Sequence, residues 1–386
     1  MNSFAFTYQT RVYFGTDATD KYLVSELKKY GKNVLLAYGK NSIKRTGVYD
    51  EMMNALKEAE KNVYEFSGIM PNPTYAKVQE GAKICRDNDI DFILAVGGGS
   101  VSDCCKVVSA QAKTDEDIWT MEFTDHRYPD EFIPMGVVVT MSGTGSEMNN
   151  GAVITNEELG LKSGVLGAYA DFTILNPAYT LTVPLRQAVS GAFDTLSHCM
   201  ETYFGKPSES FITDEINEAV MRNTIDNTRK MVADPTDVNV RGELLWDSAM
   251  GENGILKIGK ITDFQCHQIE HQLGAFTDCN HGMGLAAVHP TLYRHLYKDN
   301  LSKFVRFARE IWNVNANGKT DEEIALEGIR CLEDFEKEIG MPTSLSEMNI
   351  TDKEILRKTA DTCNITRGCA RQLSRYEIYD ILLECL

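Results

Sequence analysis

Three of the chain's seven histidines lie in one short stretch, "HQIEHQLGAFTDCNHG" at residues 267–282. His267 and His271 are four residues apart, so they would share one face of a helix, and His281 follows after a short turn. Two histidines one helical turn apart indicate a metal site. The same letters spell H-x-x-E-H, the inverted zinc-peptidase motif, in which Glu270 would serve as general base.

A second pair of potential ligands lies upstream, in "VSGAFDTLSHCMETY" at residues 189–203. Asp194 and His198 are again four residues apart in a helical pattern. Two such pairs together with His281 predict a divalent-metal site. Three imidazoles and one carboxylate, with no thiolate, suit Fe²⁺, Zn²⁺, Co²⁺ or Mn²⁺. A peptidase would leave Asp194 and His198 without a role, which makes it the weaker alternative.

Two turns rich in small residues each follow an apolar run. In "DFILAVGGGSVSDCCK" (91–106), a buried strand is expected to lead through three glycines into a helix that begins at Ser100. Glycines allow a ligand to approach the backbone, and a helix N-terminus offers N–H groups to a phosphate. The purely structural alternative is a capping box formed by Ser100 and Asp103. The second turn lies in "GVVVTMSGTGSEMNNGAVI" (136–154), and both turns are expected at the carboxyl edge of one sheet, where ligands bind.

The sequence pattern of the elements that would position these residues changes once along the chain. Up to about residue 183, amphipathic stretches such as 44–59 and 75–88 alternate with short apolar runs at 33–38, 62–66, 91–96, 135–140 and 172–175. This alternation predicts a mostly parallel sheet covered by helices on both faces. The alternating opening "FAFTYQTRVYF" is expected to form an edge hairpin. After Pro184 the pattern is helical, so we expect an α/β dinucleotide-binding domain over 1–183 and an all-helical metal-binding, catalytic domain over 184–386.

Composition narrows the class of protein. A chain of 386 residues with 43% hydrophobic and 25% charged residues is typical of a two-domain globular protein. Its net charge of −17 argues against nucleic acid as a partner. No run approaches the ~20 apolar residues of a membrane span, and the opening residues lack the pattern of a signal peptide. We therefore expect a cytoplasmic protein without a membrane partner, whose ten cysteines are reduced thiols.

The whole chain resembles the iron-containing (group III) alcohol dehydrogenases, especially their butanol dehydrogenase and aldehyde reductase branch. The resemblance rests on "GIMPNPTY" (68–75), "GGGSVSD" (97–103), "TGSEMNNGAVI" (144–154), D-x3-H at 194–198 and H-x3-H-x9-HG at 267–282. It implies the dehydroquinate synthase-like architecture, an α/β domain followed by a helical one. It also implies that Asp194, His198, His267 and His281 hold Fe²⁺ or Zn²⁺, while His271 is left for proton relay.

The resemblance further implies hydride transfer between a nicotinamide cofactor and a small alcohol or aldehyde, in a cleft between the domains. The cation would act as a Lewis acid, a role that redox-inert zinc could also fill. The residues expected to bind the cofactor are Gly39, Lys40, Ser42, Gly97, Gly98, Gly99, Ser100, Asp103, Thr140, Thr144, Gly145, Ser146 and Lys162. A lyase of the dehydroquinate synthase type and a non-enzymatic metal or nucleotide binder are the alternatives. The family and the exposed opening segment also favour a homodimer.

The sequence after the run 33–38 bears on the choice of cofactor. In dinucleotide-binding sheets, a carboxylate beyond the second strand binds the adenosine ribose and repels a 2′-phosphate. No Asp or Glu occurs between Lys32 and Asp50. Gly39, Lys40 and Ser42 stand there instead, and a lysine and a hydroxyl can bind a phosphate. The sequence therefore favours NADP(H) over NAD(H).

Overall fold

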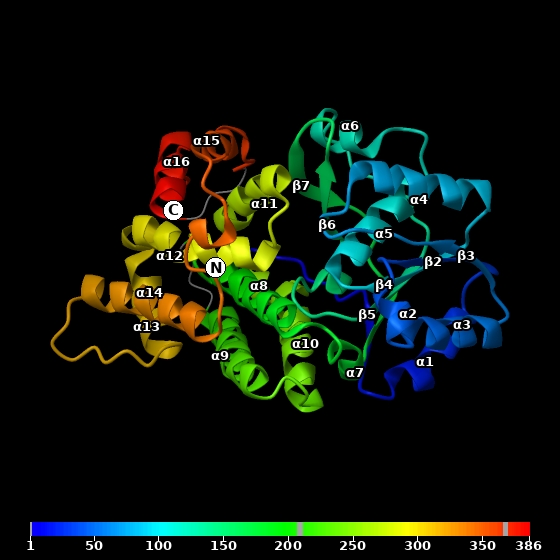
Figure 1. Cartoon of the computed structure of the whole chain (residues 1–386), viewed down its shortest axis with the longest axis horizontal. Coiled ribbons are helices and arrows are strands. Elements are labelled where there is room, and N and C mark those ends of the chain that lie inside the picture. The colour runs from blue at the N-terminus through cyan, green and yellow to red at the C-terminus, as the bar shows by residue number, and fades with distance from the viewer. Residues whose placement is uncertain (1, 207–210, 366–369) are drawn as a thin grey trace. The chain divides into compact units, whose positions relative to one another are not determined.

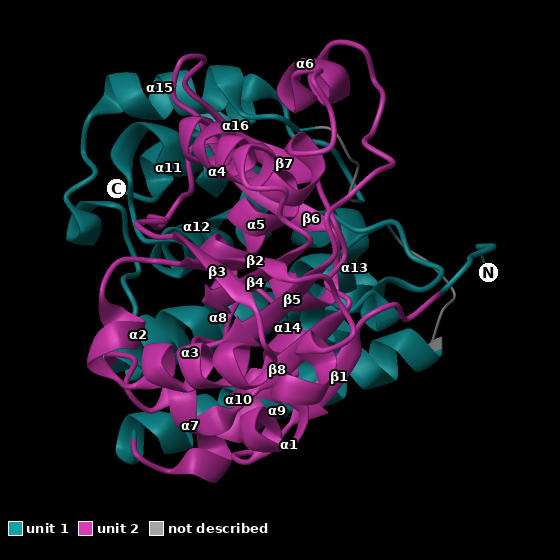
Figure 2. Cartoon of the chain, turned by 90° about the vertical axis from the view of Figure 1, so that its right-hand side faces the viewer, with its two compact units in different colours: residues 1–6, 185–235, 250–386 teal, residues 7–184, 236–249 magenta. Residues whose placement is uncertain are grey.

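The computed structural model describes residues 2–206, 211–365 and 370–386. Two compact units are distinguished in Figure 2. The α/β unit consists of Thr7–Pro184 and Thr236–Ala249. The helical unit consists of Met1–Phe6, Leu185–Pro235 and Met250–Leu386. The segment Thr236–Ala249 joins the α/β unit because Leu245 and Ala249 pack into its hydrophobic core.

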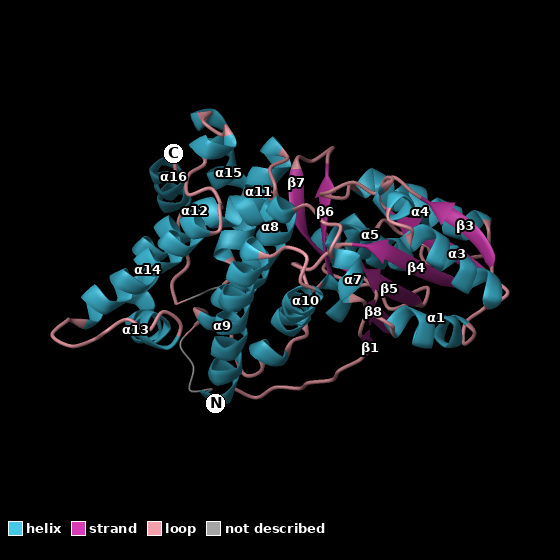
Figure 3. Ribbon diagram, turned by 60° about the horizontal axis from the view of Figure 1, so that its bottom comes forward, coloured by secondary structure: helices cyan, strands magenta, loops and turns pink. Residues whose placement is uncertain are grey.

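A six-stranded parallel sheet forms the centre of the α/β unit (Figure 3). Its strands are β1 (Arg11–Phe14), β2 (Asn33–Tyr38), β3 (Asn62–Phe66), β4 (Phe92–Gly97), β5 (Met135–Val139) and β8 (Phe172–Leu175), in the order β1-β8-β5-β4-β2-β3. Every strand predicted from an apolar run is present, and every pairing is parallel. The predicted parallel α/β fold is therefore confirmed.

Helices cover both faces of this sheet. Leu36 and Tyr38 of β2 pack in one cluster with α1 (Ala18–Leu27) and α3 (Val48–Glu58). Leu35 and Ala37 pack in the other with α4 (Tyr75–Asp87) and α5 (Gly99–Gln111). The helix that follows β2 and the helix that follows its neighbour β4 thus lie on opposite faces. Such a switch point, at the carboxyl ends of two adjacent strands, is where open α/β sheets bind ligands.

The prediction of an edge hairpin in the opening segment is wrong. Residues 2–10 form no strand, and only β1 joins the sheet, as its edge strand parallel to β8. The alternating aromatics of this segment are instead exposed, with 56% of Phe4, 42% of Phe6 and 44% of Tyr8 accessible to solvent. Alternation reports which side of an extended chain is apolar, but it does not supply a hydrogen-bonding partner.

One antiparallel pair was not predicted from the sequence. β6 (Gly151–Asn156) pairs with β7 (Leu161–Leu166) in a separate two-stranded sheet. A bridge between Thr74 and Thr155 connects β6 to the start of α4. A short α6 (Ile118–Phe123) and α7 (Pro177–Thr180) complete the unit, together with α2 (Ser42–Arg45).

The described residues of the helical unit form no β-strand, as predicted for the second half of the chain. Its helices, labelled in Figure 1, are α8 (Leu185–Tyr203), α9 (Phe211–Ala233), α11 (Gln265–Thr277), α12 (His281–Leu296), α13 (Leu301–Glu310), α14 (Asp321–Glu338), α15 (Lys353–Thr362) and α16 (Arg375–Glu384). α10 (Val238–Glu252) begins in the α/β unit. None of the described helices has the length and apolar composition that a bilayer span requires.

Candidate functional site

Three helices of the helical unit bring the expected metal ligands together. Asp194 and His198 lie one turn apart on α8, His267 lies near the start of α11, and His281 is the first residue of α12. Asp194 Oδ1 lies 3.6 Å from His198 Nδ1, 3.6 Å from His267 Nε2 and 3.4 Å from His281 Nε2. The three expected histidine ligands therefore lie within 3.6 Å of one carboxylate oxygen of the fourth, Asp194.

The atoms in this cluster fit a divalent cation. Asp194 Oδ1, His198 Nδ1 and His267 Nε2 are buried and make no hydrogen bond within the described ranges. Buried polar atoms rarely lack a partner. Their separations of 3.4–3.6 Å match the edges of a coordination shell, because ligand atoms about 2.1 Å from a tetrahedral cation lie about 3.4 Å apart. Asp194, His267 and His281 form a group whose ligand atoms lie within 4.8 Å of one another; His198 approaches Asp194 but does not belong to this group.

The protonation of His198 and Asp194 suits the same role. Burial lowers the pKa of His198 to about 4, so its ring is neutral at pH 7 and has a lone pair to donate. Burial acts to raise the pKa of Asp194, but the neighbouring His198 and His281 hold it well below its usual range. A carboxylate and a neutral imidazole are the forms in which these groups bind metal. Burial acts to lower the pKa of His267, but Glu201 and Asp194 raise it to about 10, so a cation would have to displace a proton from this ring.

Two buried glutamates orient two of the histidines. His267 Nδ1 is hydrogen-bonded to Glu201, and His281 Nδ1 is hydrogen-bonded to Glu270, which leaves each Nε2 directed at Asp194. Glu270 is the glutamate of the peptidase-like motif, and this contact gives it a different role. Glu201 was not predicted as a site residue from the sequence, although its spacing from Asp194 and His198 places it on the same helix face.

His271 lies beside the cluster rather than in it. Its ring stacks on that of His281, with centroids 5.3 Å apart. It shares a second candidate group with Glu270 and His281, but it does not belong to the group around Asp194. His289, by contrast, is a core residue, because its Nε2 lies 2.6 Å from the Ser197 hydroxyl in the buried interior.

In the α/β unit, the two small-residue turns are in contact. Thr140 N–H donates to the Gly97 carbonyl at 2.9 Å. A Cβ atom on Gly99 would lie 2.2 Å from Thr144 Oγ1, so only glycine allows this approach. The N-cap of α5 is Gly98, and no described side chain caps this end of the helix. The first N–H groups of α5, at Gly99 and Ser100, therefore suit a phosphate.

Asp103 does not form the capping box that was the structural alternative. Its carboxylate accepts hydrogen bonds from the Ser146 hydroxyl at 2.5 Å and from the Val153 N–H at 2.9 Å. Asp103 and Ser146, both expected at the cofactor, are thus buried and bonded to each other. This pair ties the α5 turn to the second turn and to β6.

A serine far away in the sequence holds the second turn. The N–H groups of Gly143 and Gly145 donate to Ser248 Oγ of α10, at 2.9 and 3.1 Å. Gly143 and Gly145 have φ values of +151° and +56°, which favour glycine. No local pattern could identify Ser248, because it lies about a hundred residues from the turn.

The segment after β2 lies at the other side of the switch point. Gly39 accepts a hydrogen bond from Gly68 N–H at 2.8 Å, Lys40 is exposed, and Ser42 begins α2. Lys44 on the same helix lies 3.5 Å from the carboxylate of Glu65, the penultimate residue of β3.

That carboxylate has further partners. It also accepts hydrogen bonds from the hydroxyls of Tyr38 and Tyr49. Lys162, the remaining expected residue, is buried on β7.

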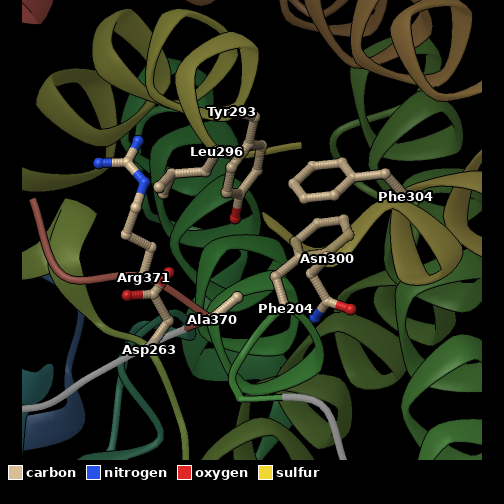
Figure 4. A pocket seen from close by; sticks show the side chains of 8 residues that line it. All are labelled: Phe204, Asp263, Tyr293, Leu296, Asn300, Phe304, Ala370 and Arg371. Atoms are coloured by element: carbon tan, nitrogen blue, oxygen red, sulfur yellow. The ribbon is translucent and has the colours of Figure 1, made fainter. Parts of the chain in front are cut away.

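Two hollows in the described part of the chain lie away from these sites. In the helical unit, a cavity of about 10 Å³ has room for about one water molecule. Figure 4 shows the Tyr293 hydroxyl pointing between the side chains that line this cavity, among them Asp263 and Phe204. In the α/β unit, a hollow of about 520 Å³ is lined by residues between Ala110 and Glu131. None of the expected site residues lines either hollow.

Comparison with known proteins gives full-length matches. The family model described as "Iron-containing alcohol dehydrogenase" matches residues 9–177, and that of the C-terminal part of the same family matches residues 188–386. The chain is 39% identical to a probable NADH-dependent butanol dehydrogenase 1 of Bacillus subtilis, over 99% of both chains. It is 34% identical to the NADPH-dependent aldehyde reductase YqhD of Escherichia coli, over 92% of this chain and 91% of the relative. The crystal structure of NADH-dependent butanol dehydrogenase A from Thermotoga maritima superposes with a TM-score of 0.94, at 34% identity, over 100% of this chain and 99% of that one.

Proposed function

The chain belongs to the iron-containing alcohol dehydrogenase family, and we propose that it transfers hydride between NADP(H) and a small primary alcohol or aldehyde. The observation that carries the proposal is the convergence of three imidazoles on the carboxylate oxygen Asp194 Oδ1. The names of its relatives, butanol dehydrogenases and an aldehyde reductase, support the class of substrate.

In this proposal Asp194, His198, His267 and His281 hold Fe²⁺ or Zn²⁺. When bound, the cation supplies a Lewis acid at the substrate oxygen, and the nicotinamide supplies or accepts the hydride. His271 is the proton relay, because its half-exposed imidazole lies beside the cluster without belonging to the group around Asp194. A neutral imidazole can accept the alcohol proton and pass it on to water.

The α/β unit would hold the cofactor at its switch point. Gly97, Gly98, Gly99 and Ser100 offer N–H groups to the pyrophosphate, and Thr140, Thr144 and Gly145 would line the nicotinamide half together with Lys162. Asp103 and Ser146 would hold the two turns in register through the bond between them. We propose residues 1–183 as the cofactor domain and 184–386 as the metal domain, a division supported by family models that end at 177 and begin at 188. The exceptions are Thr236–Ala249, which packs in the α/β unit, and Met1–Phe6, which belongs to the helical unit.

The choice between NADPH and NADH rests on the segment after β2. Gly39, Lys40 and Ser42 leave space, charge and a hydroxyl for a 2′-phosphate. The names of the relatives point both ways, because the butanol dehydrogenases are described as NADH-dependent and the aldehyde reductase as NADPH-dependent. We propose NADP(H) on the local chemistry of this segment.

The proposed reaction has a direct test. Metal-free protein reconstituted with Fe²⁺ or Zn²⁺ should oxidise reduced cofactor continuously when butanal is added, and should reduce oxidised cofactor with butan-1-ol. A lyase that uses the nicotinamide catalytically would show no net consumption, and neither would a protein that only binds metal or nucleotide. Absorbance at the wavelength of the reduced cofactor measures the rate. Absence of turnover with a panel of short aldehydes, despite bound metal and cofactor, would contradict the proposal.

We also propose a cytoplasmic homodimer. The segment before the edge strand β1 exposes the apolar side chains of Phe4 and Phe6, which a second copy can cover. Light scattering at micromolar concentration should give twice the chain mass of 43.2 kDa. A monomer under these conditions would remove the dimer from the proposal.

A further inference from the structure

We propose that Glu201 and Glu270 set how tightly the site holds its cation, although neither glutamate is itself a ligand. The inference rests on the proposed function, because it concerns the four ligands assigned there. Each glutamate is fully buried, and each holds the Nδ1 atom of one ligand histidine. Both are positioning residues, which act on the cation through His267 and His281.

Glu201 joins two of the ligand-bearing helices. It lies on α8, and its carboxylate accepts hydrogen bonds from His267 Nδ1 and from the N–H groups of Cys266 at 2.6 Å and His267 at 3.1 Å. Phe264, the N-cap of α11, has a side chain that cannot accept a hydrogen bond, and Asp263 accepts from the first N–H of the helix, that of Gln265, at 3.1 Å. Glu201 therefore caps α11 from another helix, where the positive end of the helix dipole also favours its charge. One carboxylate thus fixes both the start of α11 and the orientation of its ligand ring.

Glu270 repeats this arrangement one helix later. It lies on α11, three residues after His267, and holds His281 Nδ1 at the start of α12. The backbone of α12 comes so close that a Cβ atom on Gly284 would lie 2.8 Å from Glu270 Cγ. A larger residue at position 284 would push Glu270 away from the imidazole. A glutamate of α8 thus holds the ligand histidine of α11, and a glutamate of α11 holds the ligand histidine of α12.

The expected consequence is a change in metal affinity. A histidine whose Nδ1–H is held by a carboxylate presents Nε2 in a single tautomer and at a fixed ring angle. Without the carboxylate, the ring must lose rotational and tautomeric freedom when it binds the cation. Substitution of such a group typically costs 10- to 100-fold in metal affinity.

A different role for Glu270 would be that of a ligand to a second cation. Glu270, His271 and His281 do form a candidate group. A cation in that group would have to displace the hydrogen bond between Glu270 and His281 Nδ1, while His281 Nε2 faces Asp194. The structure favours the positioning role, and metal stoichiometry separates the two.

The test compares Glu201→Gln and Glu270→Gln with a matched control, Glu218→Gln. Glu218 is a buried glutamate of the same unit that accepts a hydrogen bond from Tyr203 at 2.6 Å and contacts none of the four ligands. The Kd for Zn²⁺ is measured on metal-free, full-length protein by competition with a chromophoric chelator. Thermal unfolding is recorded with and without Zn²⁺.

We expect the Kd of Glu201→Gln and Glu270→Gln to rise about tenfold or more, and that of Glu218→Gln to change by less than about twofold. The increase in Tm on adding Zn²⁺ should shrink in the first two variants. In Glu218→Gln, Tm should fall equally with and without metal. If Glu201→Gln does not fold because α11 has lost its cap, Glu270→Gln alone carries the test.

Unchanged zinc affinity in the folded variants would overturn the inference, as would a loss of Tm that is the same with and without metal. Two zinc ions per wild-type chain and one per Glu270→Gln chain would show Glu270 to be a ligand instead. These results leave the proposed function standing, provided that the wild type binds zinc and Asp194→Ala does not. A wild type that binds no divalent cation would reject the proposed function together with the inference.

Discussion

Asp194→Ala should remove the metal and the activity together. Asp194 Oδ1 is the atom on which His198, His267 and His281 converge, and it supplies a carboxylate oxygen among the three rings. Without it the cation has one ligand fewer and is poorly held. Because a Lewis acid contributes several kcal/mol to such a reaction, kcat/KM should fall by roughly a thousandfold or more. Elemental analysis and the aldehyde assay measure the two losses.

His271→Ala is the matched control for this prediction. His271 is also a histidine and lies one helical turn from His267, but the His271→Ala protein should keep its full metal content. If His271 relays the proton, its loss should lower kcat by about 10²- to 10⁴-fold and alter the pH profile. Metal lost from His271→Ala but retained in His281→Ala would reverse the assignment of ligand and relay.

The parallel sheet could be predicted because each of its strands carries its own signal. β2 and β4 are buried on both faces, so "NVLLAY" and "FILAVG" are continuous apolar runs. The opening segment and the β6–β7 pair differ from these strands. The first alternates like a strand yet forms no strand over residues 2–10. The second, with "GAVITN" as β6, is a short run that ends in polar residues, and it packs against α5. Partner choice is a tertiary property that local pattern does not contain.

The candidate metal cluster could be predicted from the sequence for a similar reason. Asp194 with His198, and His267 with His271, are pairs at helical spacing, so the helix itself places them on one face. The sequence could not show which histidine of the second pair faces Asp194, because this depends on how α11 is held. Such details depend on Glu201 and Ser248, whose partners lie 66 and about 100 residues away in the sequence, respectively. A single glutamate or serine carries no recognisable motif, so the role of each becomes visible only in the folded chain.

Cofactor preference is the second large effect that we expect. Wild-type protein should use NADPH with at least tenfold higher kcat/KM than NADH, and Gly39→Asp should reverse the preference. A charge-assisted contact to the 2′-phosphate is worth about 1.5–3 kcal/mol, or roughly tenfold to over a hundredfold. The substitution fits the backbone, because a Cβ atom on Gly39 would meet its nearest neighbour, the Ile69 carbonyl oxygen, at 3.4 Å. The new carboxylate would repel the phosphate and accept hydrogen bonds from the ribose.

Two neighbouring lysines sharpen this test. Lys40 is exposed after β2, whereas Lys44 Nζ lies 3.5 Å from Glu65 and 4.5 Å from the ring centroid of Tyr49. The charge of Lys44 is thus already balanced by Glu65, so Lys40 is the lysine left to bind the phosphate. Lys40→Met should lower kcat/KM for NADPH and leave that for NADH unchanged, while Lys44→Met should leave the ratio of the two nearly as it was. Equal kcat/KM for both cofactors in the wild type would show that this segment does not recognise the 2′-phosphate. The same conclusion would follow if Gly39→Asp did not shift the preference toward NADH.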